Sequence, residues 1–546
     1  MTKYAETGIK GIINWSDQEN IANWQNLQYG MFIHWGLYSE LGGEWQGEPV
    51  KKGYSEQIQM WADISEEDYK EVAKKFSAEN YDPKAICQLA KDAGMKYIVI
   101  TSKHHDGFSL FGTDTTDYNL VQMTPFAKDA IKMLAEECEN YGLKFGLYYS
   151  LVDWHQGHEF NHQNNNTIND HIEGVIENQL RELLTDYGPI AEVWFDMSSP
   201  TLAQSEKFAG IVRELQPDAC INGRIWNNKG DFRTLADNQV PEISLEGAWQ
   251  TPASIYRETW GYRNWQERND FDGKVKDLTH TLVSVIARGG NYLLNIGPKG
   301  DGSILPFEAE VLEEIGKWVK RHPEAAVGAK PTKIKEQEWG VATLQGQDLY
   351  LHIKNWPDSG VIKLPNLVTG VEKVEEDSSF MELGWSVEDY TLTIQLPQEP
   401  ADDILPVVKV TLVDQLYIIP EKAAYPAEKG HWKLSSEDLD LGYSYADKGH
   451  YFSLYETKVK LSAYLATEGE ESPVTIKIKA AVKEDERYLI SLGNKKVTVL
   501  GKDLQNIEGL HLPKDKKIAE LEITLADPSF ANEDLQLEVE SITIEK

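Results

Sequence analysis

The sequence is poor in cysteine and has no long apolar run. Only three cysteines occur in 546 residues (Cys87, Cys138 and Cys220), an odd number without metal-like spacing, so neither a disulfide framework nor a cysteine metal site is expected. No stretch of about 18 apolar residues occurs, and residues 1–20 lack the apolar core of a secretory signal. We therefore expect no membrane-spanning helix, and a cytoplasmic location unless a leader was removed.

Positive charge is also scarce. The chain has 54 lysines and arginines against 88 aspartates and glutamates, a formal net charge of −34. Such a surface argues against nucleic acid or an anionic membrane as the main partner, and a neutral substrate suits it better. Charge says nothing about the fold, and the oligomeric state stays open.

Strand-like and helix-like segments alternate over about the first 300 residues. Several of the strand candidates are continuously apolar, which is typical of parallel strands buried on both faces. The strand candidates are residues 29–35, 97–102, 144–151, 191–197, 219–223 and 291–296. Helical periodicity covers residues 65–76, 83–93, 130–141, 168–187, 205–215, 275–288 and 306–321. The alternation predicts an α/β fold, a (β/α)₈-type barrel that is incomplete near residues 230–260, where the sequence is typical of a loop.

After about residue 321 the helical period stops. Short alternating segments are separated by turn residues and charges, the pattern of β-sandwich modules. They include residues 349–353, 390–395, 407–412, 474–478, 488–492 and 535–544. We therefore predict a catalytic barrel in residues 1–325, a β-sandwich in residues 326–418 and a β-rich C-terminal module in residues 419–546.

Polar and aromatic side chains gather where the predicted barrel strands end. In barrels of this class the carboxyl ends of the strands meet at one mouth, where active sites lie. The side chains in question are His34, Trp35, His104, His105, Asp106, Tyr148, Tyr149, Asp153, Trp154, Trp194, Asp196 and Arg224. Packing alone does not explain why five strands end in polar and aromatic side chains at the same mouth of the barrel.

Asp196 is the strongest single candidate among these residues. A carboxylate at the end of an apolar strand is partly desolvated, which is costly unless donors or a function compensate. It could cap the next segment or pair with Arg224. Trp194, two residues earlier, points the same way, and a tryptophan beside a carboxylate can hold the apolar face of a sugar ring against the reacting atom. This arrangement favours a functional role.

The adjacent histidines His104 and His105 have three interpretations: polar loop residues, metal ligands, or groups that bind substrate hydroxyls. Neighbouring residues at a strand end project to opposite sides, so both rarely reach one ion. The chain also lacks a His-x-His or His-Glu-x-x-His pair. Hydrogen bonding to hydroxyls is therefore the better interpretation.

Five separated motifs resemble those of glycoside hydrolase family 29. They are Met-Phe-Ile-His-Trp-Gly at 31–36, His-His-Asp-Gly-Phe at 104–108, Phe-Gly-Leu-Tyr-Tyr-Ser at 145–150, Trp-Phe-Asp at 194–196 and Thr-Trp-Gly-Tyr-Arg at 259–263. Their order and spacing agree with the family over about residues 25–325. Residues 41–45 (Leu-Gly-Gly-Glu-Trp) and 53–57 (Gly-Tyr-Ser-Glu-Gln) are most similar to bacterial members of its linkage-selective branch.

The resemblance implies an exo-acting, retaining α-L-fucosidase that needs no metal or organic cofactor and takes a fucosylated oligosaccharide or glycan as its partner. It places the nucleophile at Asp196. It also implies a set of sugar-binding residues: His34, His104, His105, one of Tyr148 and Tyr149 with Tyr149 preferred, Glu44 and Trp45 as a second patch, Trp194 before the nucleophile, Arg224 near it, and Trp260 on the methyl side of the sugar.

The acid/base carboxyl is where this sequence departs from the family. Many relatives have Trp-Glu where this chain has Trp249-Gln250, and an amide cannot supply the proton. Similar loops carry a glutamate within one residue of the Asp237 position, so we favour Asp237, and Glu242 and Glu246 remain alternatives. The linkage and the aglycone stay open.

Two other functions remain in view. One is a metal-dependent barrel hydrolase that uses His34, His104, His105 and Asp196, which bound-metal analysis would reveal. The other is a noncatalytic sugar-binding relative that has lost its acid/base, which Gln250 makes conceivable. Activity on an aryl fucoside discriminates against the second, because a good leaving group needs little acid assistance.

Overall fold

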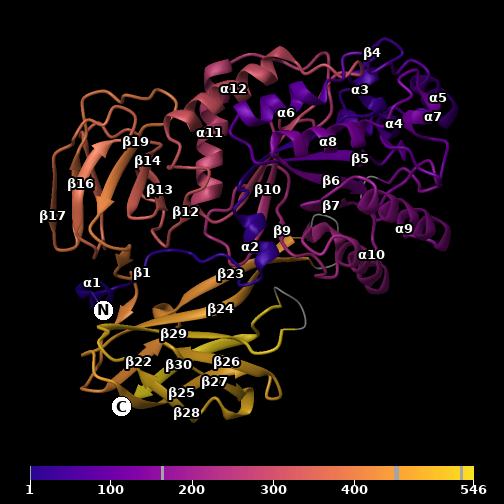
Figure 1. Cartoon of the computed structure of the whole chain (residues 1–546). Helices are drawn as coiled ribbons and strands as arrows, with labels where there is room; N and C mark the ends of the chain where they lie inside the picture. Colours follow the sequence, from indigo (N-terminus) through magenta and orange to yellow (C-terminus); the bar gives the residue numbers. More distant parts are fainter. Residues whose placement is uncertain (1, 162–164, 448–453, 529–532) are drawn as a thin grey trace.

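The computed structural model describes residues 2–161, 165–447, 454–528 and 533–546, and it consists of a barrel followed by two β-sandwiches (Figure 1). Three separate hydrophobic clusters form most of the interior, one for each of these bodies. The cysteines Cys87, Cys138 and Cys220 are buried free thiols.

Eight parallel strands form the barrel, and strands adjacent in space follow each other in sequence, except that the last strand, β11, pairs with the first, β2. They are β2 (Tyr29–Ile33), β5 (Tyr97–Lys103), β6 (Lys144–Ser150), β7 (Glu192–Asp196), β8 (Cys220–Ile221), β9 (Arg233–Thr234), β10 (Trp249–Ser254) and β11 (Asn291–Ile296). A single parallel bridge between Asn222 and Phe232 joins β8 to β9 and closes the ring. The predicted barrel class and its six apolar strands are confirmed. β9 and β10 lie within residues 230–260, which the sequence predicts to be mostly loop.

Helices cover the outside of most of the barrel. The main ones are α6 (Pro83–Asp92), α8 (Ala130–Tyr141), α9 (Asp170–Thr185), α10 (Leu202–Leu215), α11 (Phe271–Ala287) and α12 (Pro306–Arg321). Local sequence sets their ends: the Asp82 carboxylate accepts the backbone N–H groups of Lys84 and Ala85 at the start of α6, and α8 ends at Gly142, whose φ of 66° is left-handed.

Shorter elements build the loops at the barrel ends. They are α2 (Glu19–Gln25), α3 (Leu37–Leu41), β3 (Glu44–Trp45), β4 (Glu48–Pro49), η1 (Ser55–Gln57), α4 (Ile58–Trp61), α5 (Glu66–Ala73), α7 (Leu120–Met123) and η2 (Gly223–Ile225). In the described chain, only η2 stands between β8 and β9, and no helix stands between β9 and β10.

The C-terminal module covers the side of the barrel that lacks these helices. Its strands β23 (Asp440–Asp447) and β24 (Leu454–Ala466) contact the segment between β9 and β10. The Glu246 N–H donates to the Tyr443 carbonyl (2.8 Å), Lys460 pairs with the Glu246 carboxylate (2.7 Å), and Gln239 donates to the Tyr445 hydroxyl (3.1 Å). A β-sheet thus takes the place that helices occupy elsewhere around the barrel.

The middle sandwich packs a five-stranded sheet on a three-stranded one, both antiparallel. The larger sheet contains β12 (Lys330–Pro331), β13 (Gly340–Gln345), β14 (Asp348–Ile353), β19 (Val407–Leu412) and β16 (Val371–Glu376). The smaller contains β15 (Val361–Leu364), β18 (Thr391–Gln395) and β17 (Trp385–Glu388). Strand β1 (Ile9–Lys10), which follows helix α1 (Lys3–Thr7), pairs with β20 (Tyr417–Ile418) and ties the N-terminal segment to this region.

The C-terminal sandwich also has two sheets. The first joins β21 (Ala423–Ala424), β24, β29 (Ile518–Leu525), β26 (Arg487–Leu492) and β27 (Lys495–Leu500), with β23 paired to β24. The second joins β22 (His431–Ser435), β30 (Leu537–Glu545), β25 (Ser472–Val482) and β28 (Ile507–Leu512). The short 3₁₀ turns η3 (Ser436–Asp438) and η4 (Gly501–Asp503) lie between strands.

None of the helices in the described ranges has the length and apolar character that crossing a membrane requires.

Candidate active site

A pocket lies at the mouth of the barrel, where the carboxyl ends of its strands meet. The space inside it, which is continuous with open solvent, is about 320 Å³. Its wall consists of Phe32, His34, Tyr54, Glu56, Gln57, His104, His105, Tyr148, Trp194, Asp196, Arg224, Asp237 and Trp260. Eight of the eleven site residues proposed from the sequence are in this wall. Glu44, Trp45 and Tyr149 are not.

Two carboxylates of the pocket are bound by one arginine. Arg224 donates from Nη1 to the Asp196 Oδ1 (2.9 Å) and from Nη2 to the Asp237 Oδ1 (2.8 Å). Its guanidinium also lies over the Trp194 ring, 4.8 Å from the centroid. Burial raises the pKa of Asp196, and the Arg224 charge opposes that shift. The Tyr148 hydroxyl donates to the other oxygen, Asp196 Oδ2 (2.9 Å), so a cation and a hydroxyl stabilise the ionised form.

The backbone after β9 brings Asp237 to the pocket. Asn238 has a left-handed φ of 58°, which asparagine tolerates better than most residues. Its N–H donates to the Pro252 carbonyl (2.9 Å) and its side-chain oxygen accepts the Ser254 N–H (2.9 Å). These bonds hold the segment against β10, so Asp237 sits on a fixed loop.

Backbone strain follows Asp196 directly and Arg224 after one intervening residue. Met197 and Ser198 have φ values of 68° and 62°, and Trp226 has a φ of 70°. Large side chains in the left-handed region cost about 1–3 kcal/mol each and persist only where the surroundings hold them. Met197 and Trp226 pack in one buried cluster, which also contains Trp154. Such strain is common at functional sites.

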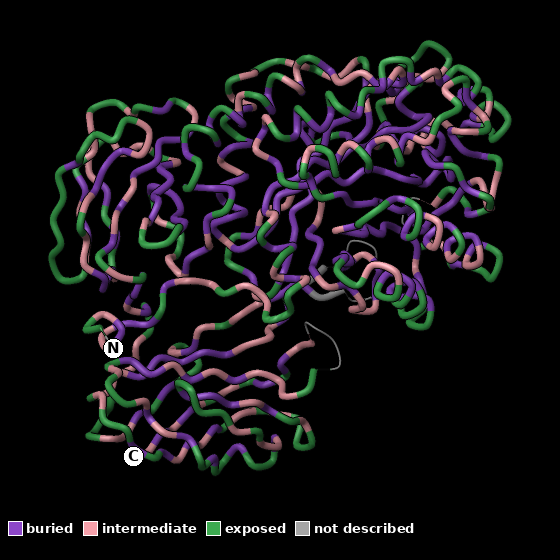
Figure 2. The backbone as a smooth tube through the Cα atoms, viewed as in Figure 1, coloured by how far each residue is buried: buried purple, intermediate pink, exposed green. Residues whose placement is uncertain are grey.

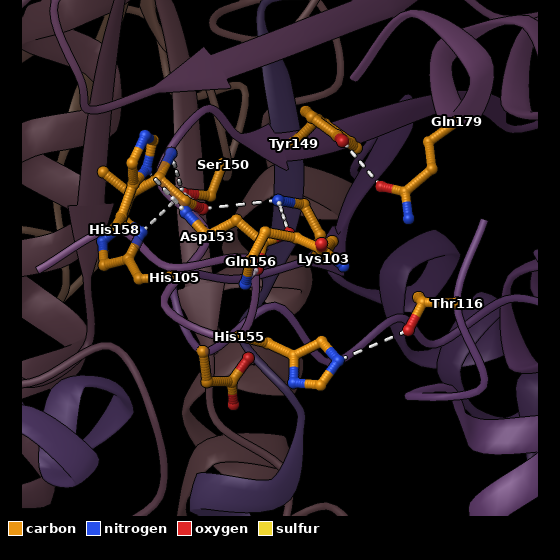
Figure 3. Close-up of polar contacts among 12 residues, drawn as sticks. Lys103, His105, Thr116, Tyr149, Ser150, Asp153, His155, Gln156, His158 and Gln179 are labelled. Atoms are coloured by element: carbon orange, nitrogen blue, oxygen red, sulfur yellow. Dashed lines mark hydrogen bonds and ion pairs between the residues drawn. The ribbon is translucent and has the colours of Figure 1, made fainter. Parts of the chain in front are cut away.

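Hydrogen bonds set the tautomers of two pocket histidines. The Asn295 amide donates to the Trp260 carbonyl (2.7 Å), so its oxygen accepts the proton on His34 Nδ1 (2.7 Å). The Ser150 hydroxyl donates to the Val152 carbonyl (3.0 Å), so its oxygen accepts from His105 Nδ1 (2.7 Å; Figure 3). Nε2 of each ring is then left as an acceptor. Burial lowers the pKa of His34 to about 3 and that of His105 well below its ordinary value, so both rings are neutral.

The third histidine lies between the other two. The His104 ring stacks on Tyr148, with centroids 5.4 Å apart, and lies 3.9 Å from the His105 ring. Burial holds its pKa well below the ordinary value. Its Nδ1 has no hydrogen-bond partner among the residues that the structure describes. A ligand with hydroxyl groups would therefore meet three uncharged imidazoles.

Two loops are clamped together to complete the wall. The hydroxyls of Ser55 and Thr259 lie 2.7 Å apart, and Glu56 Oε2 accepts the N–H groups of Trp260 (3.2 Å) and Gly261 (2.9 Å). Arg263 donates to the Gly53 carbonyl (2.7 Å). The clamp fixes the Trp260 ring at the pocket.

Of the two adjacent tyrosines, the structure places Tyr148, and not the preferred Tyr149, in the pocket wall. The Tyr149 hydroxyl donates to the Gln179 side chain (2.6 Å) on α9, away from the pocket (Figure 3). The Lys103 ammonium lies over its ring, 4.6 Å from the centroid. Successive residues of a strand point to opposite faces, so Tyr148 faces the pocket and Tyr149 the outer layer.

Glu44 and Trp45 also lie elsewhere. They form strand β3 of a small hairpin with β4, and neither belongs to the pocket wall. Glu56 and Gln57 occupy the wall instead. Burial raises the pKa of Glu56 to about 7. Glu56 and Gln57 belong to residues 53–57, one of the two segments that resemble the family's linkage-selective branch. The other segment, residues 41–45, also contains a glutamate, and only the fold shows which of the two glutamates reaches the pocket.

Of the three acid/base candidates, only Asp237 lies in the pocket wall. Glu246 pairs with Lys460 of the C-terminal module (2.7 Å), and Glu242 is exposed. Gln250 is buried and accepts the Trp194 indole N–H (2.9 Å). Tyr54 and Phe32 are wall residues that sequence reasoning did not single out.

Across the ranges that the structure describes, no group of three or more His, Cys, Asp and Glu side chains is arranged to hold a metal ion. His34 and His105 each use Nδ1 as a donor to a protein oxygen. The arrangement is suited to binding hydroxyl groups and to acid/base or nucleophilic chemistry by carboxylates.

The chain matches known proteins over the same region. The sequence profile of the family described as Alpha-L-fucosidase matches residues 7–324. An α-L-fucosidase from Branchiostoma floridae is 29% identical over 71% of this chain and 91% of that protein.

Solved structures agree with these matches. The α-L-fucosidase from Vibrio sp. strain EJY3 is 25% identical, with a TM-score of 0.67 over 98% of this chain and 99% of that chain. A Bacteroides thetaiotaomicron enzyme, solved as a trapped covalent intermediate with 2-fluoro-fucosyl fluoride, shares the fold at 23% identity and a TM-score of 0.66, covering 75% of this chain and 99% of that chain.

Proposed function

We propose, from the premise that the chain belongs to the α-L-fucosidase family and is a glycoside hydrolase, that it is an exo-acting retaining enzyme. It removes terminal α-L-fucosyl groups from oligosaccharides or glycoconjugates by double displacement. The substrate is a neutral sugar, in keeping with the net charge of −34.

One observation carries the proposal: a single guanidinium binds both Asp196 and Asp237 in one pocket. Retaining glycosidases need two carboxyl groups about 5–5.5 Å apart, whereas inverting enzymes need about 6.5–9.5 Å to admit a water molecule. One terminal nitrogen of Arg224 donates to Asp196 and the other donates to Asp237. Because the two nitrogens belong to one guanidinium, the two carboxyl groups are close together, which supports the shorter separation of a retaining enzyme.

In the first step, an ionised Asp196 oxygen attacks the anomeric carbon while the Asp237 carboxyl gives its proton to the departing glycosidic oxygen. The glycosidic bond breaks and a covalent glycosyl–enzyme forms. In the second step, Asp237 takes a proton from water, which attacks the same carbon and releases Asp196. Arg224 and Tyr148 stabilise the Asp196 carboxylate whenever it is free.

The remaining wall residues bind and orient the sugar. Nε2 of His34 and of His105 can accept hydroxyl protons, because Asn295 and Ser150 hold the other nitrogen as a donor. Trp194 and Trp260 offer apolar surface to the ring and its methyl group. The floor is closed by buried side chains such as Phe32 and Tyr148, which suits a terminal residue and hence exo action.

The test is the configuration of the first sugar released. Proton NMR during hydrolysis of an aryl α-L-fucoside should show α-L-fucose before mutarotation, because two inversions restore the configuration. Initial β-L-fucose would contradict double displacement. The same assay with a chelator tests the metal-dependent alternative, which predicts loss of activity, and no turnover at all would favour a noncatalytic binding protein.

A further inference from the structure

Exposed apolar side chains are concentrated at one edge of the middle sandwich. Eleven large hydrophobic residues are exposed in the described chain, and five of them fall within residues 380–390. We call these five the β17 patch: Phe380, Met381, Trp385, Val387 and Tyr390. The edge lies far from the barrel mouth, and its backbone is exposed along nearly its whole length (Figures 1 and 2). Apolar clusters of this kind on a protein surface mark interaction sites.

The strand register shows why two of these side chains are uncovered. Trp385 pairs with Ile394 and Val387 pairs with Leu392, and directly paired residues lie on the same face of a sheet. Ile394 and Leu392 are buried in the core of the middle sandwich, whereas Trp385 and Val387 are exposed. The core face of the small sheet therefore extends onto its edge strand β17, where the opposing sheet does not cover it.

The turns beside β17 hold two aromatic residues in an unfavourable backbone conformation. Phe380 has a φ of 58° and is 70% exposed, and Tyr390 has a φ of 60° and is 45% exposed. Asp389 (φ 47°) and Tyr390 form the two-residue turn between β17 and β18, a place where Asn-Gly is preferred. Burial does not compensate this strain. Strained residues of this kind point to a function for the exposed rings.

Charge excludes several occupants of the patch. Residues 380–390 contain three carboxylates (Glu382, Glu388 and Asp389) and no lysine or arginine, although the Lys373 ammonium outside this stretch lies 4.0 Å from Glu382. Nucleic acid and anionic membranes would be repelled. A second copy that docked through the same patch would place like charges opposite each other at a two-fold contact. Neutral hydroxyl groups, in contrast, donate to carboxylates without a charge penalty.

We propose that the β17 patch is a second glycan-binding site, remote from the catalytic pocket and specific for neutral sugars. The Trp385 and Tyr390 rings stack on the apolar faces of sugar rings, and the neighbouring carboxylates accept their hydroxyls. The choice of glycans as the ligand class rests on the proposed function. Because the site is joined to the hydrolase, it raises the effective concentration of the enzyme on a polymeric substrate.

The test compares a double variant with a matched control. Trp385→Ala/Tyr390→Ala removes the two rings, and Tyr425→Ala removes a tyrosine that is 79% exposed outside the patch. Both are made in the full chain carrying Asp196→Asn, so that binding is measured without turnover. The probes are two neutral glycans, desialylated mucin and defucosylated xyloglucan, in affinity electrophoresis.

We expect at least one probe to retard the parent chain and the Tyr425 control equally, and the double variant to bind it about tenfold more weakly. With active Asp196 restored, all three chains should cleave an aryl fucoside alike. This keeps the outcome separate from the proposed function, because binding to a defucosylated glycan needs no fucosidase activity.

Three results would overturn the proposal. The first is no retardation of the parent chain by either probe, and the second is equal retardation of the double variant. The third is a dimer, seen by light scattering, that the double variant alone converts to a monomer, since this would show that a second copy covers the patch.

Discussion

Arg224 binds Asp196 through Nη1 (2.9 Å) and Asp237 through Nη2 (2.8 Å), so one side chain positions both carboxyl groups of the pocket. All three residues are largely buried: their side chains are 11%, 9% and 15% exposed. Charges in such surroundings are less screened than on the surface. Changing any one of the three should therefore affect the other two.

Asp196→Asn should lower kcat at least about a hundredfold, a barrier increase of about 2.7 kcal/mol, on every fucoside. The amide keeps the shape of the side chain and can still accept from Tyr148, but it is not a nucleophile. Steady-state kinetics with an aryl fucoside measure the effect, and circular dichroism checks the fold. A variant that retains a tenth or more of kcat would show that Asp196 is not the nucleophile.

Asp237→Ala should slow substrates with poor leaving groups far more than an activated aryl fucoside, because only the poor leaving groups need the proton. Azide should restore the second step by attacking the glycosyl–enzyme. Glu242→Ala and Glu246→Ala are the controls, since neither residue lines the pocket. If either control, and not Asp237→Ala, shows leaving-group dependence and azide rescue, the assignment is wrong.

Arg224→Met should move the acidic limb of the kcat/KM profile to higher pH. Asp196 must be ionised to attack; burial raises its pKa, and the Arg224 charge lowers it. Without that charge the pKa rises further, and a higher pH is needed to ionise the carboxyl. Arg213→Met is the control, because Arg213 pairs with Asp231 (3.0 Å) away from the pocket. If the acidic limb of the Arg224→Met profile stays in place or moves to lower pH, Arg224 does not lower the pKa of the catalytic carboxylate.

The sequence predicts the barrel strands correctly where the local apolar pattern matches the burial of the strand in the fold. Continuous apolar runs predicted β2, β5, β6, β7, β8 and β11, since strands buried on both faces need them. β9 has only two residues, and β10 reads Trp-Gln-Thr-Pro-Ala-Ser, with no strand-like apolar pattern. β10 exists because it pairs with β11 over five residues, which is a tertiary cause.

Within the site, the sequence identified which residue types meet but not which of two neighbours faces inward. Tyr148 and Tyr149 differ only in strand phase, and a one-residue change reverses the face. Glu44 and Glu56 are separated by a hairpin whose path the sequence does not specify. In contrast, Asp196 is the last residue of β7 and Arg224 lies in η2 shortly after β8, so the barrel topology alone places them at the mouth.

Replacing each of Tyr148 and Tyr149 by phenylalanine tests which of the two serves the pocket. Tyr148→Phe removes the hydroxyl that donates to Asp196 (2.9 Å). A hydrogen bond to a charged group contributes about 1.5–3 kcal/mol, so kcat/KM should fall about 10- to 150-fold. Tyr149→Phe removes only the bond to Gln179 (2.6 Å) behind the barrel wall. It should change thermal stability slightly and kcat/KM little; the reverse pattern would restore Tyr149 as the sugar-binding residue.

Glu56→Gln should make the barrel more stable than wild type at pH 8 but not at pH 4. Burial raises the pKa of Glu56 from 4.5 to about 7, so the folded state holds the proton more tightly than the unfolded state does. Below about pH 4.5 both states are protonated. As the pH rises towards 7 the unfolded state loses its proton first, and wild-type stability falls by an amount on the order of 3 kcal/mol, complete above pH 7.

Glutamine removes this dependence without removing the clamp. Its carbonyl oxygen can still accept the N–H groups of Trp260 and Gly261, and it does not ionise. Other buried carboxyl groups such as Glu192, whose pKa burial also raises to about 7, titrate in both proteins and cancel in the difference. Thermal unfolding from pH 4 to pH 8 measures the difference, with Glu310→Gln, an exposed position on α12, as the control for lost charge. The stability advantage of Glu56→Gln over wild type grows with pH only if the folded state keeps Glu56 protonated. An advantage that is constant with pH, or that shrinks as the pH rises, would therefore show that Glu56 is ionised throughout.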